Sequence, residues 1–339
     1  MLMKLAFRIA AAALGLSVFV GAAGAAVTLN GAGATFPEPI YQKWFYEFYK
    51  GCGVKVNYQG IGSGGGIQAM KSGTVDFGGT DAPLDNNSLK YMPGPMVQIP
   101  TCGGAVALAH TSGVPNLQLS PSTLAGIFLG QIKTWNDAKI KADNPAANLP
   151  AKAITVVHRS DGSGTTFLFT TYLSAVSPTW KSKCGAGKEV RWPCGQGGKG
   201  NPGVAGLVKQ LPGAIGYVEL TYALTNQLPT AALKNASGQF VKPSLQSATA
   251  CIEGSMDKLK ADVRTPIVNA TGAGVYPITG LTFIMAYTNQ KDDAKGGELV
   301  HLLKWCMGDG AQDMAAAYQY APLPAALIQT NLALIAKIK

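Results

Sequence analysis

The chain has 339 residues and a net charge of +10, but only 14% of its residues are charged. The basic balance favours an anionic partner. No run of Lys and Arg is present that could follow a phosphate backbone, so we expect no nucleic-acid partner. The length is sufficient for two hydrophobic cores.

The N-terminus has the pattern of a secretory signal peptide. Lys4 and Arg8 precede an apolar run from Ile9 to Val20, and small residues follow. The run is shorter than the roughly 20 residues that a membrane-spanning helix needs. We therefore expect residues 1–25 to be removed after Ala25 and the mature chain to be exported, although cleavage after Ala26 fits nearly as well.

Six cysteines lie in this exported chain, and none has C-x-x-C spacing. Disulfides are therefore expected rather than a zinc site, and no metal is expected. Cys184 and Cys194 flank a short loop and form the best candidate pair. The pairing of the others stays open, and so does an unpaired thiol.

Short apolar runs bounded by glycine alternate with helical patterns along the chain, which predicts an α/β fold with mixed sheets flanked by helices. In chain order the pattern predicts strands at 27–30, 54–58, 75–77, 105–109, 154–158, 214–220 and 281–287, and helices at 39–49, 122–129 and 298–306.

A chain of this size often divides into two lobes. The strand-like segments 103–110 and 276–287 are the candidate crossing points, so the lobes are expected to be joined by a two-strand hinge. We expect lobe I to combine residues 26–107 with 280–339, and lobe II to comprise residues 108–279.

Two glycine-rich turns in the first third of the chain each lie between a strand and a helix. The first, GAGATFPEP, carries Thr35, and its two prolines favour the opening turn of a helix. The second, GIGSGGG, carries Ser63. Unpaired backbone N–H groups at such helix starts bind anions, although Ser63 could also serve as an ordinary helix cap.

A third turn, HRSDGSGTTFLFTTYL, is the most informative segment. Arg159 ends a strand, and Gly162 to Thr165 lead directly into a helix. A guanidinium, the hydroxyls of Ser163 and Thr165 and backbone amides therefore meet at one helix start, which suits a tetrahedral oxyanion. Asp161 is expected to hold Arg159 in place by a charge-assisted pair.

Asp81 follows a strand and lies close to Pro83 in the sequence DAPL. An aspartate in this setting is commonly a turn or cap residue. If it faces a bound anion instead, the anion must bring a hydrogen to donate, because an unmatched buried acceptor costs about 1 to 3 kcal/mol. That condition favours protonated phosphate over sulfate.

Other motifs give weaker signals. The fourth glycine turn, residues 197–203, is assigned to packing and lobe shape. No turn fits the nucleotide-binding P-loop or dinucleotide patterns, and Gly162-Ser163-Gly164 lacks the frame of a nucleophile elbow. The three histidines are isolated, so neither a metal site nor a Ser-His pair is expected, and no cofactor is implied.

The linked turns resemble the periplasmic phosphate-binding proteins of phosphate-specific ABC importers. The similarity rests on GAGATFPEPIYQKW, VNYQGIGSGGGIQAMKSGTVDFGGTDAPL, VVHRSDGSGTTFLFTTYL, GGKGNPGVAGLVKQLPGAIGYVELTYA and YPITGLTFI, and it covers nearly the whole mature chain. The six cysteines depart from this family, which needs none.

The resemblance implies a two-lobed periplasmic-binding-protein fold that closes on one phosphate and docks, as a monomer, on a transmembrane permease. The resemblance also implies that the protein is not an enzyme. The phosphate-binding residues carried over are Thr35, Phe36 through its backbone N–H, Ser63, Asp81, Arg159, Ser163, Gly164 and Thr165, with Asp161 in support.

Three alternatives are weighed against this reading. One is a phosphatase or serine hydrolase that uses Ser163, which lacks a plausible base. A second is a secreted phosphate-binding surface protein. The third is a binding protein for sulfate or molybdate, against which Asp81 argues.

Overall fold

The computed structural model describes residues 27–339, and the predicted signal peptide at 1–25 lies outside the described residues. Within them, eight strands form a mixed sheet in the order β2-β1-β3-β11-β4-β8-β6-β7, and three short strands form a second sheet, β10-β9-β5. The strands are β1 (Thr28–Gly33), β2 (Lys55–Gly60), β3 (Phe77–Thr80), β4 (Met96–His110), β5 (Gln118–Leu119), β6 (Thr155–Arg159), β7 (Gln196–Gly198), β8 (Ala214–Glu219), β9 (Ala232–Lys234), β10 (Phe240–Val241) and β11 (Thr279–Tyr287).

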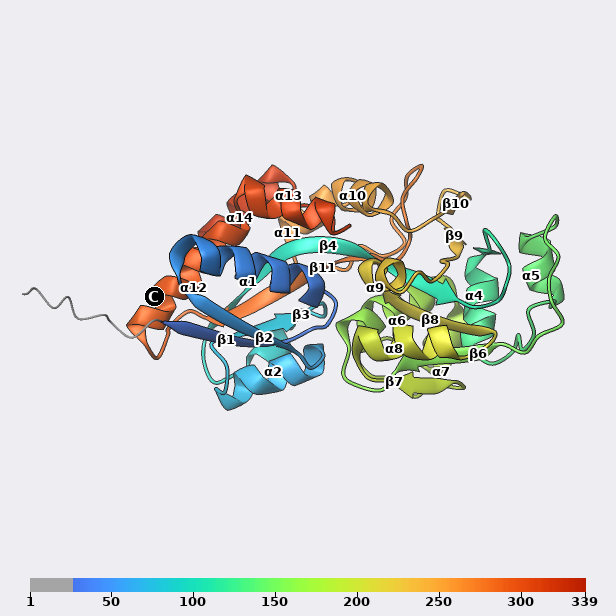
Figure 1. The fold of residues 1–339 in the computed structure, drawn as a ribbon, viewed down its shortest axis with the longest axis horizontal. Coiled ribbons are helices and arrows are strands. Elements are labelled where there is room, and N and C mark those ends of the chain that lie inside the picture. The colour runs from blue at the N-terminus through green and yellow to red at the C-terminus, as the bar shows by residue number, and fades with distance from the viewer. Residues whose placement is uncertain (1–26) are drawn as a thin grey trace, which may run out of the picture.

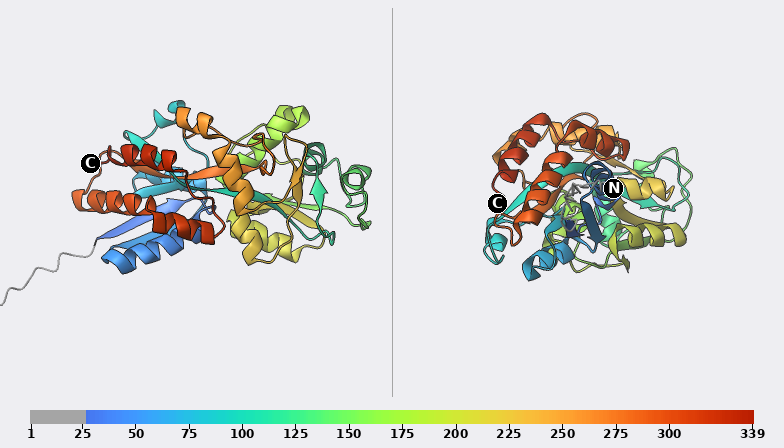
Figure 2. Two further views of the ribbon diagram at one scale, coloured as in Figure 1. Left: turned by 90° about the horizontal axis from the view of Figure 1, so that it is seen from above. Right: turned by 60° about the vertical axis from the view of Figure 1, so that its left-hand side comes forward.

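Helices flank the strands on either side (Figures 1 and 2). Within residues 27–339, every helix is too short or too polar to pass through a bilayer. The helices are α1 (Glu38–Cys52), α2 (Ser63–Ser72), α3 (Asn86–Leu89), α4 (Pro121–Phe128), α5 (Ala138–Asp143), α6 (Gly164–Val176), α7 (Pro178–Lys183), α8 (Gly200–Gln210), α9 (Leu220–Thr225), α10 (Leu245–Glu253), α11 (Met256–Ala261), α12 (Asp293–Cys306), α13 (Asp309–Ala317) and α14 (Ala325–Ile335).

Strand β4 is shared by both halves of the large sheet. Residues 96–105 pair antiparallel with β11, and residues 106–110 pair antiparallel with β8. Figure 1 shows β4 running from the half that holds β1, β2 and β3 into the half that holds β6, β7 and β8. The parallel pairs β1–β2 and β6–β8 beside these antiparallel pairs confirm the predicted α/β class with a mixed sheet.

The observed strand β4 is much longer than the predicted strand 105–109. Pro100, Gly103 and Gly104 interrupt the apolar pattern that the prediction relied on. The structure accommodates this stretch with a shift of register: Thr282 and Phe283 of β11 pair with Cys102 and Pro100, so β4 has one extra residue between them. The expected hinge strand 103–110 is therefore only the second half of β4.

The lobe boundaries expected from the sequence stay a proposal. Helix α10 contacts β4 and β11, and helix α11 contacts α14. Figure 1 shows both helices beside α13 rather than beside α6 and α8. Residues 245–261 therefore pack on the half of the sheet that was assigned to lobe I, although they belong to the segment 108–279.

The predicted Cys184–Cys194 disulfide is wrong in this structure, where all six cysteines are free. Cys184 ends helix α7, and its N–H donates to Trp180 O. The Cys194 thiol instead lies against the carbonyl oxygens of Ile127 and Phe128, at 3.8 and 3.6 Å. Loop length suggested the pair, but it does not fix the direction of the two side chains.

Gly33 closes strand β1 and provides a stability test. Its φ is +151°, and a Cβ there would overlap the carbonyl oxygen of Gly79 on β3. Gly33→Ala should lower the free energy of unfolding by about 2 kcal/mol or more, because both the backbone conformation and the strand contact are lost. Urea denaturation measures the change.

Gly51→Ala is the matched control for Gly33→Ala. Gly51 lies in helix α1, and a Cβ there would meet nothing within 4 Å. Alanine should leave stability unchanged or raise it by up to about 1 kcal/mol, since it is the better helix former. Equal midpoints for the two variants would contradict the assigned role of Gly33.

Candidate functional site

The predicted site residues follow the ends of four strands. In the first half of the sheet, Thr35 follows β1, Ser63 follows β2 and Asp81 follows β3. In the second half, Arg159 is the last residue of β6, and Ser163 caps the N-terminus of α6. The carboxyl ends of such strands are where open α/β sheets bind ligands.

The two groups of loops are in direct contact. Gly164 N–H donates to Ser63 Oγ at 3.0 Å, and Gly64 N–H donates to the carbonyl oxygen of Gly162 at 2.8 Å. A Cβ on Gly164 would lie 2.5 Å from Asp81 Oδ2 and 2.6 Å from Ser63 Oγ. The structure therefore brings residues from the two halves of the chain together, and only a glycine fits at position 164.

Arg159 and Asp161 form the ion pair expected from the sequence. The Arg159 Nε and Nη2 groups donate to the two Asp161 oxygens at 2.8 and 2.6 Å, and Gly200 N–H adds a bond of 2.9 Å to Oδ1. Burial alone would raise the pKa of Asp161, but the Arg159 hydrogen bonds hold it below its ordinary value. The carboxylate therefore fixes the guanidinium, whose Nη1 reaches Thr165 Oγ1 at 3.3 Å.

Four buried hydroxyl groups at the site act as hydrogen-bond acceptors. Each oxygen accepts an N–H from the protein, and within residues 27–339 none of the four donates its own hydrogen to a protein acceptor. A buried donor without an acceptor is costly, so this arrangement suits a ligand rich in acceptor oxygens. The bonds are Asn201 Nδ2 to Thr35 at 2.9 Å, Asp81 N to Ser63 at 3.2 Å, Thr166 N to Ser163 at 3.0 Å and Asn201 Nδ2 to Thr165 at 3.3 Å.

Phe36 contributes backbone rather than side-chain chemistry. Its ring is fully buried and packs edge-on against Tyr320, with 6.2 Å between the ring centroids. The carbonyl oxygen accepts the Tyr320 hydroxyl at 2.7 Å. Its N–H has no protein acceptor within residues 27–339, so this amide adds a further free donor beside Thr35.

Asp81 is an acidic group that lies among these donors. It is 2% exposed, and its Oδ1 accepts the Thr282 hydroxyl at 2.8 Å. Burial raises the pKa of Asp81 to about 7, even though the Thr282 bond and the charge of Arg159 both favour the ionised form. The second oxygen, Oδ2, faces Gly164. This oxygen accepts no protein hydrogen within residues 27–339, so it is open to a ligand with a hydrogen to donate.

Asn201 was missed by the sequence reasoning, which assigned its turn to packing. It is fully buried at the start of α8, and its Nδ2 contacts both Thr35 and Thr165. Its Oδ1 accepts the N–H of Glu219 at 2.9 Å. Its position in the sequence could have identified it, because Asn201 follows a strand and a glycine turn as the predicted site residues do.

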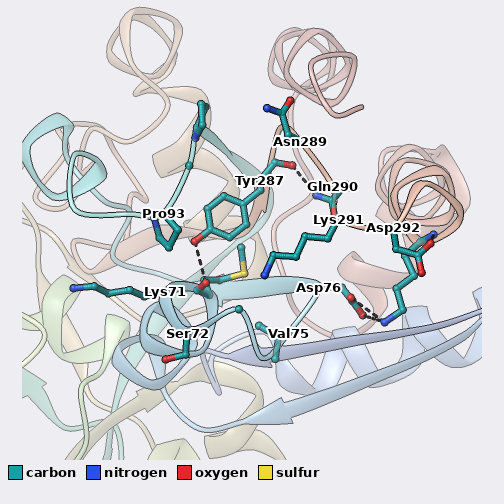
Figure 3. Close-up of a pocket in the computed structure, with 15 residues that line it drawn as sticks. Lys71, Ser72, Val75, Asp76, Pro93, Tyr287, Asn289, Gln290, Lys291 and Asp292 are labelled. Carbon is teal, nitrogen blue, oxygen red and sulfur yellow. Dashed lines mark hydrogen bonds and ion pairs between the residues drawn. The ribbon is translucent and has the colours of Figure 1, made fainter.

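A separate cavity of about 480 Å³ lies elsewhere on the first half of the sheet and contains none of the predicted site residues. Figure 3 shows Tyr287 and Lys291 beside it, and Lys295 is already paired with Asp76 at 3.0 Å. Lys71 and Lys291 are exposed and Lys295 is partly buried in its ion pair, so these lysines are not a set of converging buried donors. We therefore place the functional site at the strand ends.

Comparison with known proteins agrees with this architecture. The model of the PBP superfamily domain matches residues 20–309. The chain is 45% identical over 306 residues to the phosphate-binding protein PstS of Xylella fastidiosa (strain Temecula1 / ATCC 700964), and the match covers 89% of this chain and 83% of that protein.

Two solved structures show the same fold. One is a high-affinity periplasmic phosphate-binding protein, PfluDING, bound with phosphate; the TM-score is 0.72 at 24% identity, covering 91% of this chain and 93% of that chain. The other is an ABC-type phosphate transport receptor from Vibrio cholerae, with a TM-score of 0.55 at 17% identity, covering 87% and 100%.

The fold and the arrangement of the strand ends are those of a periplasmic-type binding protein with two connected α/β halves. The chain belongs to the PBP superfamily and, within it, to the family of the phosphate-binding proteins PstS.

Gly164→Ala tests whether the two loop groups must touch. The added methyl would push Asp81 and Ser63 away from helix α6, so binding of phosphate, the expected ligand, should weaken at least about tenfold. Isothermal titration measures the affinity.

Gly206→Ala is the matched control, because a Cβ at this helical position would meet nothing within 4 Å. Equal phosphate affinity in the two variants would show that the close contact at Gly164 is unnecessary.

Proposed function

We propose that the chain binds one inorganic phosphate between its two lobes in the periplasm and delivers it to an ABC-type importer. The observation that carries the proposal is the set of four buried hydroxyls whose hydrogens have no protein acceptor within residues 27–339. Membership of the PstS family supports phosphate as the ligand.

The donor set matches the oxygens of a phosphate ion. Thr35, Ser63, Ser163 and Thr165 supply hydroxyl hydrogens, and the N–H of Phe36 supplies a further donor. Arg159 brings a positive charge that Asp161 holds in a fixed orientation. These directed donors, rather than a cluster of lysines, would bind the dianion, so salt should weaken binding only modestly.

Asp81 would distinguish phosphate from sulfate by the hydrogen that each anion can or cannot donate. Monohydrogen phosphate can donate its hydrogen to Asp81 Oδ2, whereas sulfate has none to give near neutral pH. A carboxylate that faces sulfate would repel it and stay without a donor, which is an expensive arrangement in a buried site.

A binding role, rather than hydrolysis, also fits the surroundings of Ser163. Its oxygen caps helix α6 by accepting Thr166 N–H. His158 stacks on Trp192 with 4.7 Å between the ring centroids, and His110 hydrogen-bonds Ser112 at 2.8 Å. Neither ring is bonded to Ser163, and the relatives are described as binding proteins.

The family supports the proposed location and delivery. One structural relative is described as periplasmic and another as an ABC-type transport receptor. We propose that lobe I (26–107 with 280–339) and lobe II (108–279, apart from the helices at 245–261 that pack on lobe I) close by bending about the two expected hinge strands, 103–110 and 276–287, since only the closed form brings both groups of loops together. The closed monomer would then be the form that docks on the permease.

Arg159→Ala should weaken phosphate binding by roughly 100-fold or more, because it removes a charged donor and leaves the half-buried Asp161 without its partner. The measurement is calorimetric titration of protein that has been unfolded, stripped of phosphate and refolded. Failure of the wild-type protein to bind phosphate would reject the proposed function itself.

Arg264→Ala is the matched control for Arg159→Ala. Arg264 makes a similar pair with Asp262, two residues away, but outside the proposed ligand set. Its loss should leave phosphate affinity within about twofold of wild type, since a partly exposed pair contributes little. Unchanged affinity in the Arg159 variant would overturn the site assignment.

Discrimination against sulfate should depend on pH through Asp81. Because burial raises the pKa of Asp81 to about 7, the carboxyl gains a proton below that pH and can donate to sulfate. Sulfate affinity should therefore rise as the pH falls from 8.5 to 5.5. In Asp81→Asn the amide donates at every pH, so the Asp81-dependent rise should disappear. Tight sulfate binding by the wild type at pH 8.5 would contradict this role.

A further inference from the structure

Glu219 is a buried acid that the proposed phosphate ligand set does not use. It is the last residue of β8, pairs with Val106 of β4 and is 0% exposed. It therefore lies beside the strand that the two halves of the sheet share. The Glu219 backbone N–H donates to Asn201 Oδ1 at 2.9 Å, and Asn201 in turn donates to Thr35 and Thr165. One residue therefore separates Glu219 from two members of the proposed ligand set.

The Glu219 carboxyl accepts one unshared hydrogen, from the Thr221 N–H to Oε2 at 2.9 Å, but the two hydroxyls beside it are shared with main-chain carbonyls. The Tyr320 hydroxyl lies 2.7 Å from the carbonyl oxygen of Phe36 and 3.0 Å from Glu219 Oε2. A phenol has one hydrogen, and a carbonyl oxygen can only accept. If Tyr320 donates to the nearer Phe36, the bond to Glu219 can form only when Glu219 supplies the hydrogen.

The same shortage recurs at Thr221. Its hydroxyl lies 2.9 Å from the carbonyl oxygen of Tyr318 and 3.3 Å from Glu219 Oε1. One hydrogen again faces two oxygens. An ionised Glu219 would therefore compete with a main-chain carbonyl at both hydroxyls, whereas one added proton relieves this competition.

Burial and the charge of Asp81 oppose the ionisation of Glu219. The titratable groups that face it are Asp81 after β3, Cys102 on β4, Tyr222 on α9 and Tyr320 after α13. Within residues 27–339, no Lys or Arg hydrogen-bonds its carboxyl. Burial raises the pKa of Glu219 to about 8, against the lowering effect of its hydrogen bonds to Thr221 and Tyr320.

Glu219 is connected to the loop that carries Thr35 and Phe36. The Tyr320 hydroxyl donates to the Phe36 carbonyl, and the Tyr222 hydroxyl donates to the Thr35 carbonyl at 2.6 Å. Ionisation of Glu219 would draw the Tyr320 hydrogen away from Phe36. It would also place a negative charge near the bound anion, so both effects disfavour phosphate.

We propose that Glu219 is a positioning residue that takes up a proton from solvent when phosphate binds, so that phosphate affinity is linked to the protonation of Glu219. The O–H bond forms at Oε2, which donates to Tyr320, and Tyr320 donates to Phe36. This inference rests on the proposed phosphate binding. Affinity should be highest while Glu219 is protonated in the free protein and should fall as the pH rises above that range.

Glu219→Gln tests the proposal, because the amide is neutral at every pH and keeps both a donor and an acceptor. Phosphate affinity is measured at pH 7 and pH 9 in both proteins. The wild type should lose about tenfold more affinity across this interval than the variant, since one proton is linked to binding. Phosphate and Asp81 titrate in both proteins, so the difference isolates Glu219.

The outcomes separate a failure of the proposed phosphate binding from a failure of the proposed role of Glu219. No phosphate binding by the wild type at pH 7 would reject the proposed function. Phosphate binding with parallel pH profiles in the two proteins would reject only the role of Glu219.

A second measurement does not require the Gln variant. Calorimetric titrations of Asp81→Asn with phosphate at pH 8.5 are run in two buffers of different ionisation enthalpy. The difference in binding enthalpy gives the number of protons taken up per phosphate, and the Asn variant removes any contribution from Asp81. After correction for the titration of phosphate itself, we expect an uptake of about half a proton or more. Zero uptake, or proton release, would overturn the proposal.

Discussion

The structure depends on a hydrogen-bond constraint at the ends of its strands. Thr35, Ser63, Ser163 and Thr165 are buried, and their oxygens already accept N–H groups. In the proposed function, their hydrogens would point to a ligand that accepts from several directions. A tetrahedral oxyanion meets this demand, and Asp81 adds the condition that the anion carry a hydrogen of its own.

The fold meets the constraint by bringing distant segments together through one long strand. Because β4 pairs with β11 in one half and with β8 in the other, the loops after β1, β2 and β3 face the loop after β6. Gly164 permits the closest approach. Asn201 then bonds Thr35 and Thr165 at once, so a single amide links the two groups of ligands.

Much of this arrangement could be predicted from the sequence, because local patterns encode it. A strand, a glycine turn and a helix start indicate where Arg159, Asp161 and Thr165 lie relative to one another. Partners that depend on three-dimensional packing could not be found in this way. Asn201 resembles an ordinary turn residue in sequence, and the shortage of hydrogens at Glu219 appears only when Tyr320, 101 residues away, is placed beside it. The wrong disulfide between Cys184 and Cys194 has the same origin, since spacing does not specify side-chain direction.

Neutron diffraction from crystals of the phosphate complex would test the central claim most directly, since it locates hydrogen atoms. We expect the hydroxyl hydrogens of Thr35, Ser63, Ser163 and Thr165 to point at one phosphate, and the hydrogen of that phosphate to lie against Asp81 Oδ2. Hydroxyl hydrogens directed at protein oxygens, or a phosphate bound in the lysine-lined cavity beside Tyr287, would contradict the account.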